Sequence, residues 1–311
     1  QYNYIERNLT TMSSVKNSAF VFIKPHANNA RTQQYVADGL RSRGITILEE
    51  GDFTGPQIDE GKLIDQHYYA IASKATLLQP EQIPVPADKF ESNFGLTWAD
   101  ALAQGRVFNA LDACKQLNVD AAALDKLWGS AKKVKFGGGF YCGEISREGQ
   151  ESLFTFNAFF MEMREKFVNA SVTIHYYVVE FEPELLSWSD FRGKVLGPTD
   201  PSAAPSDSLR GSLYTAWEEY GLAEQPNTGD NCVHASASPF EGLAERMNWL
   251  KRDPESDPFG AAAIAAGISV ETLRAWSVDP QVKGKSVFDQ LEDTNAAECL
   301  ERMVALNAQI A

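Results

Sequence analysis

The side chains best suited to chemistry lie in the second half of the chain. They occupy three short stretches, which read Gly197-Pro-Thr-Asp-Pro, Ser208-Leu-Arg-Gly and Asn231-Cys-Val-His-Ala-Ser-Ala-Ser. The imidazole of His234 has an unperturbed pKa of about 6.5, so at pH 7 most of it is a neutral nucleophile. Arg210 offers a planar guanidinium that can bind two phosphate oxygens, and Thr199 offers a hydroxyl donor. These residue types favour transfer of a phosphoryl group to His234.

Common motifs for other phosphate, metal and redox sites are absent from the sequence. There is no GxxxxGK[ST], no GxGxxG that opens a helix and no HExxH. The triplet Gly137–Gly139 lacks the lysine that follows a phosphate-binding loop, which favours a tight turn feeding a strand. The four cysteines are far apart, and their spacing favours reduced thiols over a metal site or disulfides. A serine hydrolase using Ser236 or Ser238 is disfavoured because no GxSxG is present.

The order and spacing of these stretches resemble the nucleoside diphosphate kinase family. In that family an asparagine lies three residues before the nucleophilic histidine, a serine two after it and a glutamate eleven after it. Here these positions hold Asn231, Ser236 and Glu245 around His234. The threonine of a Gly-x-Thr loop and an arginine eleven residues later are matched by Thr199 and Arg210. Ile23-Lys24-Pro25 and His67-Tyr68 add to the resemblance, which covers residues 19–73 and about 152–249.

The resemblance implies a nucleoside diphosphate kinase that works by ping-pong transfer. A nucleoside triphosphate would phosphorylate His234, and a diphosphate would then take up the group. Glu245 would fix the other ring nitrogen, and Ser236 completes the catalytic set. Mg²⁺ would be bound mainly through the nucleotide phosphates, without a dedicated set of protein ligands. The implied nucleotide-binding residues are Lys24 and Asn231 at the ribose and phosphate, Tyr68, Thr199 and Arg210 at the phosphates, and Phe160, with Phe159 as the alternative, stacked on the base.

Three departures from the family pattern support a second hypothesis. Ala237 replaces an aspartate that supports the magnesium, and Gly193 replaces a second phosphate arginine, which Arg192 or Lys194 could supply instead. The segment 74–151, where the family has a short connection, is interpreted as an insertion. The chain could therefore be a catalytically weak or inactive nucleotide-binding or structural protein of the same fold, incorporated in a larger assembly.

Hydrophobic periodicity predicts how the chain positions these residues. Strands are expected at 19–24, 45–53, 171–181 and 231–235, and helices at 31–43, 60–73, 154–167 and about 208–220. This order indicates an α+β fold. With the resemblance, it predicts a ferredoxin-like sandwich with a four-stranded antiparallel sheet. We expect one domain over 19–249, interrupted by a helical insertion at 74–151, and a helical C-terminal extension at 250–311.

Composition limits the partners. The 311 residues are 44% hydrophobic and 23% charged, with a net charge of −14, as expected for a soluble globular protein. An acidic surface repels a phosphate backbone, so no nucleic-acid partner is expected. No apolar run is long enough to cross a membrane, and Gln1–Ser18 lacks the order of a secretion signal, which predicts a cytoplasmic protein. Nucleoside tri- and diphosphates remain the expected partners, with a homo-oligomer or a larger assembly left open.

Overall fold

The chain forms two compact units in the computed structural model, which describes residues 15–147 and 149–309. One unit comprises the chain up to Gln57 together with Ala170 onward, and the other is Ile58–Asn169. The expected insertion, 74–151, lies inside the second unit, which is longer at both ends. The expected extension, 250–311, lies in the first unit. Most of the segment on which the secretion-signal prediction rests lies outside the described residues.

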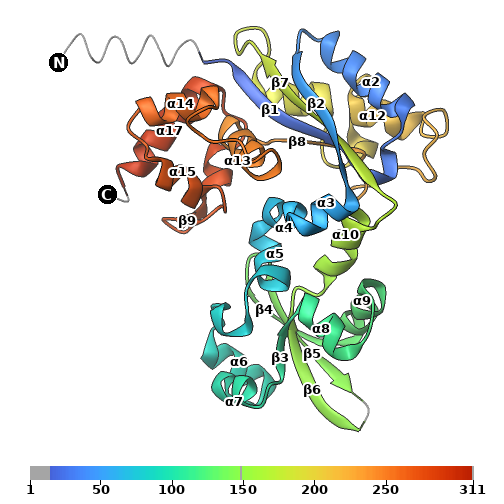
Figure 1. The fold of residues 1–311 in the computed structure, drawn as a ribbon, viewed down its shortest axis with the longest axis vertical. Coiled ribbons are helices and arrows are strands. Elements are labelled where there is room, and N and C mark those ends of the chain that lie inside the picture. The colour runs from blue at the N-terminus through green and yellow to red at the C-terminus, as the bar shows by residue number, and fades with distance from the viewer. Residues whose placement is uncertain (1–14, 148, 310–311) are drawn as a thin grey trace. The chain divides into compact units, whose positions relative to one another are not determined.

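The first unit is built on a four-stranded sheet in which neighbouring strands are antiparallel (Figure 1). The strand order is β2-β7-β1-β8, so the predicted antiparallel sheet is confirmed. The strands are β1 (Asn17–Ile23), β2 (Thr46–Thr54), β7 (Thr173–Phe181) and β8 (Val233–Ala235). Each lies within two residues of its predicted limits at both ends. Strong β-branched and aromatic content explains why these segments are recognisable.

Both faces of β1 are buried, and its alternate residues divide between them. Ala19, Val21 and Ile23 join a core cluster with residues of α2 (Ala30–Arg41) and α12 (Leu209–Thr215). Phe20 and Phe22 point to the opposite face, where their rings pack against Trp249 of α13 (Pro239–Trp249). The sheet therefore lies between two helical layers, and α13 covers the face that carries the aromatic rings.

The second unit contains a sheet of its own, which corrects the prediction of a helical insertion. Its strand order is β3-β6-β5-β4, with β3 parallel to β6 and the other pairs antiparallel. The strands are β3 (Val107–Asn109), β4 (Lys132–Gly137), β5 (Phe140–Arg147) and β6 (Gln150–Phe156). The Gly137–Gly139 segment joins β4 to β5, so the predicted turn is confirmed.

Two predicted helices differ from the structure in this unit. The helix expected at 154–167 begins only at Phe159, because residues 150–156 form β6. Leu153 and Phe154 are buried on opposite sides of that strand, and a strand buried on both faces resembles a helix in hydrophobic pattern. The helix expected at 60–73 is broken into α4 (Leu63–His67) and α5 (Tyr69–Ala72), followed by a π-helical turn. The other helices that lie in this unit are α6 (Ala87–Phe94), α7 (Trp98–Ala103), α8 (Ala110–Leu117), α9 (Ala121–Ser130) and α10 (Phe159–Val168).

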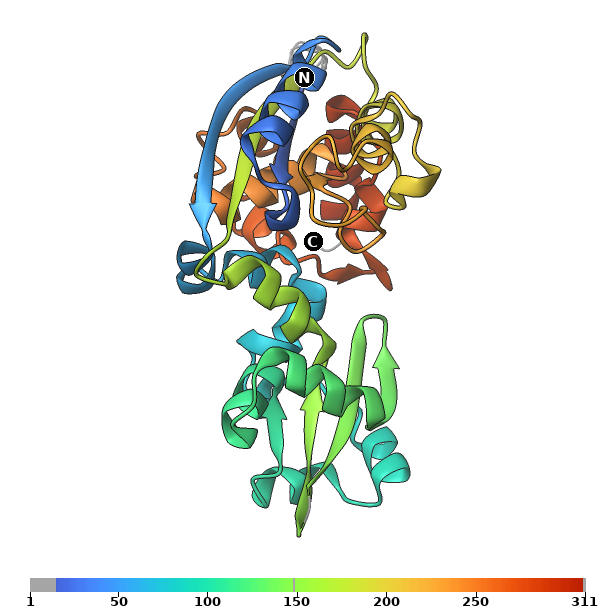
Figure 2. The same cartoon turned by 90° about the vertical axis from the view of Figure 1, so that its right-hand side faces the viewer.

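The C-terminal part of the first unit has a hydrophobic cluster that includes two residues of α13, Phe240 and Leu243. Figure 2 shows these orange and red helices next to the sheet of the same unit. Arg246 of α13 anchors them through two hydrogen bonds to Asp257, and both side chains are almost completely buried. The elements after α13 are α14 (Pro258–Ala265), α15 (Val270–Trp276), β9 (Gln281–Val282), β10 (Lys285–Ser286), α16 (Val287–Leu291) and α17 (Ala296–Asn307). The remaining short helices are α3 (Gly55–Glu60) and α11 (Trp188–Asp190).

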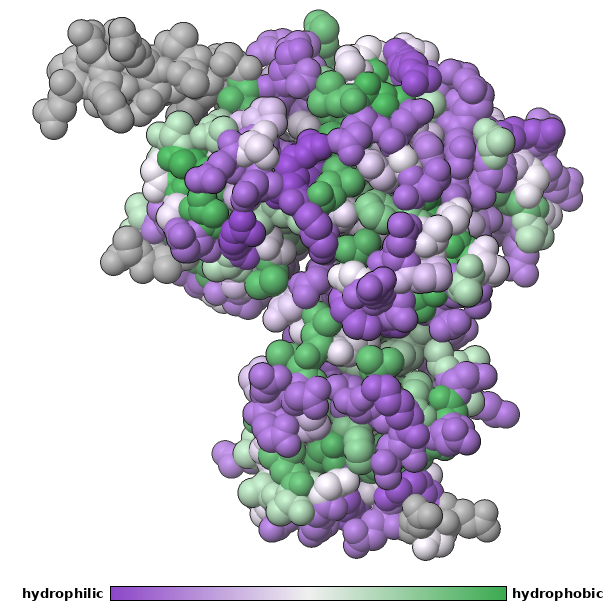
Figure 3. Space-filling view, viewed as in Figure 1, coloured by the Kyte–Doolittle hydropathy of each residue, from purple (hydrophilic) through white to green (hydrophobic). Residues whose placement is uncertain are grey.

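Few large hydrophobic side chains are exposed in the described ranges. Three large hydrophobic side chains are exposed there, Leu48, Leu185 and Val304. The face of the first unit seen in Figure 3 is mostly hydrophilic, with small hydrophobic areas between. Within residues 15–147 and 149–309, no helix combines the length and apolarity that a membrane span needs.

Replacing Asp257 by alanine should destabilise the first unit by about 3–5 kcal/mol, because Arg246 would keep a buried charge without its carboxylate. Denaturant unfolding, monitored through the fluorescence of a tryptophan in this unit, measures the loss of unfolding free energy. Asp253→Ala is the matched control, since its ion pair with Arg274 is exposed, and should cost less than about 1 kcal/mol. Equal losses in the two variants would contradict this account of the buried pair.

Candidate active site

His234 lies at the centre of β8, one of the two edge strands of the sheet. It pairs with Phe22 of β1, and the two rings stack with their centroids 4.6 Å apart. Its Nε2 lies 2.6 Å from Oε1 of Glu245, which projects from α13. The side chain of Glu245 is 5% exposed and that of His234 is 16% exposed. Strand β8 and helix α13 therefore hold an imidazole and a carboxylate together at a sheltered place.

Ser236 holds the second oxygen of the Glu245 carboxylate. Its hydroxyl donates to Oε2 at 2.5 Å and accepts the N–H of Phe20 at 2.9 Å. Ser236 is completely buried, so it is a positioning residue and not a nucleophile. Ser238 caps the start of α13 by accepting the N–H of Glu241. Both serines thus have structural tasks, which agrees with the absence of a hydrolase motif.

The contact with Glu245 decides which ring nitrogen of His234 is the nucleophile. A carboxylate oxygen accepts a hydrogen bond, so the hydrogen of the neutral imidazole lies on Nε2. The lone pair is then on Nδ1, at the other side of the ring. When Nδ1 forms a new bond, the ring becomes cationic, and the adjacent carboxylate stabilises that charge.

Burial and three cations hold the pKa of His234 well below its usual range. Burial is the largest cause, and the charges of Lys24, Arg210 and Arg192 add to it. The contact with the Glu245 carboxylate favours the protonated ring, but the net shift of the pKa is downward. His234 is therefore neutral at pH 7, as a nucleophile must be.

Lys24 and Arg210 reach this place from two different elements. Lys24 follows β1 and donates from Nζ to the carbonyl of Gly229 at 2.9 Å. Arg210 of α12 donates to the carbonyl of Val233 from Nε at 3.0 Å and from Nη2 at 2.7 Å, and its Nη1 donates to Gly197. The guanidinium thereby joins the loop before α12 to the strand that carries His234, while its positive charge acts on the imidazole.

A strained turn precedes His234. Cys232 has a φ of +67°, and the N–H of Val233 donates to the carbonyl of Asn231 at 2.8 Å, which closes a γ-turn around it. A γ-turn with positive φ is the rarer, strained form. Burial raises the pKa of the Cys232 thiol to about 12, so it is not a reactive thiolate. The sequence gives no sign of this turn, because a cysteine seldom adopts such a conformation.

The turn presents the side chain of Asn231 to the loop at Thr199. Its Nδ2 donates to the carbonyl of Thr199 at 3.0 Å, whereas its buried Oδ1 has no hydrogen-bond partner within the described part of the chain. Leaving a buried acceptor without a donor costs free energy. Asn231 thus contacts the backbone of Thr199, and Thr199 itself is exposed.

Three other predicted site residues are engaged elsewhere or belong to the other unit. Arg192 acts electrostatically on His234 but is paired with Glu292 and Asp293. The Lys194 side chain is 74% exposed and pairs with Asp190, one turn earlier. Tyr68, between α4 and α5, belongs to the second unit.

The prediction that Phe160 stacks on the base is wrong. This residue belongs to the hydrophobic core of the second unit and has no exposed surface. A ring without an exposed face cannot stack on a base. The alternative, Phe159, is half-buried and packs against the ring of Trp128.

Glu241 is a member of the site that the sequence analysis missed. Its carboxylate accepts a hydrogen bond from the backbone of Ala237, and burial together with the nearby charge of Glu245 raises its pKa well above the usual range. A signal was present, since Ser238-x-x-Glu241 before an apolar run is the pattern of a capping box.

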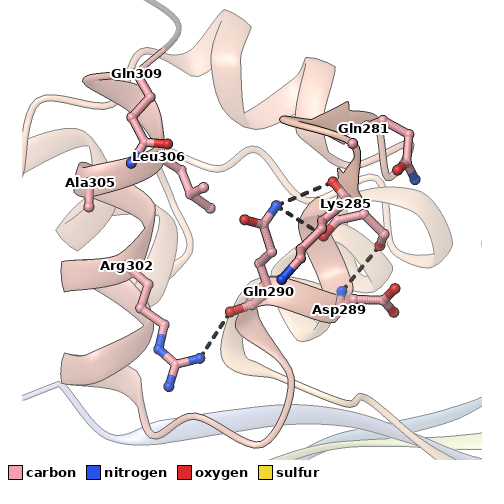
Figure 4. A pocket seen from close by; sticks show the side chains of 10 residues that line it. Gln281, Lys285, Asp289, Gln290, Arg302, Ala305, Leu306 and Gln309 are labelled. Carbon is pink, nitrogen blue, oxygen red and sulfur yellow. Dashed lines mark hydrogen bonds between the residues drawn. The ribbon is translucent and has the colours of Figure 1, made fainter.

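A separate cavity of about 710 Å³ lies among the C-terminal elements (Figure 4). It is lined by residues of β10, α16 and α17, including Lys285, Asp289 and Arg302. Arg302 already donates to Glu298 and to the carbonyl of Gln290. The cavity has no histidine among its lining residues, and the guanidinium of Arg302 is already engaged.

Comparisons with known proteins leave the family open. No protein-family model matches the chain, and no curated protein sequence does. Among solved structures, the apo cubic form of nucleoside diphosphate kinase from Encephalitozoon cuniculi is similar at 15% identity and a TM-score of 0.37, covering 76% of this chain and 90% of that one. An NDP kinase from Pyrobaculum aerophilum gives 15% identity and a TM-score of 0.36, covering 76% and 96%. Values this low establish neither membership of that family nor its activity.

The pKa of His234 should be below 6.5 and should rise when a neighbouring cation is removed. Lys24→Gln takes away one of the charges that oppose protonation, so the midpoint should move upward. Nitrogen-15 NMR of the imidazole across a pH series measures it and identifies the Nε2–H tautomer. Lys194→Gln, which removes an exposed lysine paired elsewhere, should leave the midpoint unchanged. A wild-type midpoint above 6.5 would contradict the assigned environment.

Proposed function

We propose that this protein transfers the γ-phosphoryl group of a nucleoside triphosphate to a nucleoside diphosphate through a phosphohistidine at His234. The observation that carries the proposal is the 2.6 Å contact between Nε2 of His234 and Glu245, within reach of the charges of Lys24, Arg210 and Arg192. A fixed, neutral imidazole among cations suits a phosphoryl acceptor better than a general base for a hydroxyl, because the cations also attract the polyphosphate.

In the first half-reaction, the lone pair of Nδ1 forms a bond to the γ-phosphorus. The bond from that phosphorus to the bridging oxygen breaks, and its electron pair leaves with the nucleoside diphosphate. The hydrogen on Nε2 stays in its bond to Glu245, whose charge balances the cationic ring. The second half-reaction is the reverse, with a different diphosphate as the acceptor. Donor and acceptor then use one site in turn, which is ping-pong transfer.

The remaining site residues of the proposal have supporting roles. Lys24 and Arg210 would stabilise charge on the phosphate oxygens, with Thr199 as a hydroxyl donor. The unpartnered Oδ1 of Asn231 suits a ribose hydroxyl, which can donate to it. Tyr68 belongs to the proposal through the sequence resemblance alone. Membership of the nucleoside diphosphate kinase family and a ferredoxin-like description of the β2-β7-β1-β8 sheet are part of the same proposal.

Magnesium fits this proposal as an ion that arrives with the nucleotide. Ala237 offers no ligand, and the carboxylates of Glu292 and Asp293 are bound to Arg192. Mg²⁺ keeps several waters and commonly takes ligands from substrate phosphates, so the chain needs no cage of its own. The ion would supply charge neutralisation on the phosphate oxygens.

Incubation with γ-labelled ATP and magnesium should yield an acid-labile, base-stable phosphoenzyme, because phosphohistidine has that stability. His234→Ala should abolish the label, and acid and base treatment of the labelled protein checks its chemistry. His175→Gln is the matched control and should keep the label, because His175 lies on β7, with β1 between it and β8, and is bonded to Asp52. A label that persists in His234→Ala would refute the mechanism.

A second candidate is a nucleotide-binding protein with little or no turnover. The pairing of Arg192 with Glu292 and Asp293 favours it, because the arginine is then engaged elsewhere, and Ala237 removes a carboxylate. In that case calorimetry would detect ATP or ADP binding while ATP-to-GDP exchange stayed near background. Rapid exchange would exclude this candidate.

A further inference from the structure

Arg192 is bound by two acidic residues from a distant part of the chain. It lies in the helical turn Phe191–Leu196, and its Nη1 donates to Oε1 of Glu292 at 2.6 Å and to Oδ1 of Asp293 at 2.8 Å. The two acids follow α16, about a hundred residues later in the chain. They raise the pKa of Arg192 in spite of its burial, so this guanidinium stays charged.

The backbone of Asp293 is held next to the segment that follows the His234 strand. The N–H of Asp293 donates at 3.0 Å to the carbonyl of Ala237, three residues after His234. Two residues further on, the side chain of Asn295 accepts the N–H of Trp188 at 2.8 Å. The indole of Trp188 in turn donates to the carbonyl of Ser236. These hydrogen bonds hold the segment that carries the two acids close to the His234 strand.

Arg192 also belongs electrostatically to the site, because its charge acts on both His234 and Glu241. The oxygens of Glu292 and Asp293 converge on one of its nitrogens, at distances that phosphate oxygens also adopt with a guanidinium. A polyphosphate that binds Nη1 of Arg192 must therefore displace the two carboxylates that already occupy this nitrogen, and their charge repels it as it approaches.

We propose that Glu292 and Asp293 act as an internal competitor of phosphate, occupying Arg192 until the phosphate chain of a nucleotide replaces them. This inference rests on the proposed function for the identity of the ligand. Arg192 is then a phosphate-binding residue whose access is set by the C-terminal segment. The acids weaken binding of a polyphosphate and favour ligands with enough charge to displace them.

Calorimetric binding of inorganic triphosphate at fixed salt tests the inference without requiring turnover. The double variant Glu292→Gln/Asp293→Asn keeps the shape of both side chains, and asparagine tolerates the positive φ of residue 293. It should bind triphosphate about tenfold more tightly than the wild type, the typical effect of one charge-assisted contact. Arg192→Gln should bind more weakly, and the triple variant should bind like Arg192→Gln alone.

The matched control is Glu298→Gln/Glu301→Gln on α17. It removes the same charge and releases Arg302 from its ion pair with Glu298, so it separates a local effect on Arg192 from a change in net charge. Its affinity should stay within about twofold of the wild type. Circular dichroism verifies that each variant is folded.

The inference is overturned if the Glu292/Asp293 variant binds triphosphate no more tightly than the wild type. It is also overturned if the control variant gains the same affinity, or if the triple variant, which lacks Arg192, still binds more tightly than Arg192→Gln. Absence of triphosphate binding in all variants would also overturn it, because a released arginine would then offer no phosphate site. If the Glu292/Asp293 variant binds triphosphate more tightly through Arg192 but His234 is never labelled by ATP, the proposed transfer is refuted and the competitor role of the two acids stands. If His234 is labelled but the variant binds triphosphate no more tightly, the transfer stands and the competitor role is refuted.

Discussion

The hydrogen bond between His234 and Glu245 is the constraint on which the rest of the site depends. Forming it requires β8 to pair with β1 in the register that sets His234 opposite Phe22, and α13 to cross the aromatic face of the sheet. Packing of Phe20 and Phe22 against Trp249 fixes that crossing. The apolar core thus determines which nitrogen of a single imidazole bears the lone pair.

Burying this pair costs free energy that the surrounding groups offset. Glu245 is almost fully buried, and its oxygens are engaged by His234 and Ser236, which reduces the cost of taking a carboxylate from water. The left-handed conformation of Cys232 adds strain of order 1–3 kcal/mol. The strained residue lies between two constraints, because the chain directs Asn231 toward Thr199 and then places His234 in the sheet. Strain at such a position agrees with a site whose geometry is held by the whole unit.

Local sequence patterns could predict a part of this structure. The strands of the first sheet are rich in β-branched and aromatic residues, and their limits were predicted closely. The family resemblance grouped His234, Ser236 and Glu245, and in the structure both His234 and Ser236 contact the carboxylate of Glu245. The strands follow from short-range periodicity, and the site residues follow from a family resemblance carried by spacings within one strand–helix unit.

Other features depend on contacts that no local pattern encodes. Strand β4 reads Lys-Lys-Val-Lys-Phe-Gly, which is too polar to identify as a strand before its pairing with β5 is known. The family resemblance implied that Phe160 stacks on a base, but the core of its unit buries it. Arg192 meets Glu292 across about a hundred residues, and its neighbour Lys194 instead pairs within its own turn. Tertiary packing decided each of these outcomes.

The position of the phosphorus on the imidazole tests the central claim most directly. Nitrogen-15 and phosphorus-31 NMR of protein incubated with ATP and magnesium can distinguish the two ring nitrogens. Because Glu245 holds Nε2, the account predicts phosphorus bonded to Nδ1 of His234. Phosphorus on Nε2, or on no nitrogen of His234, would contradict it.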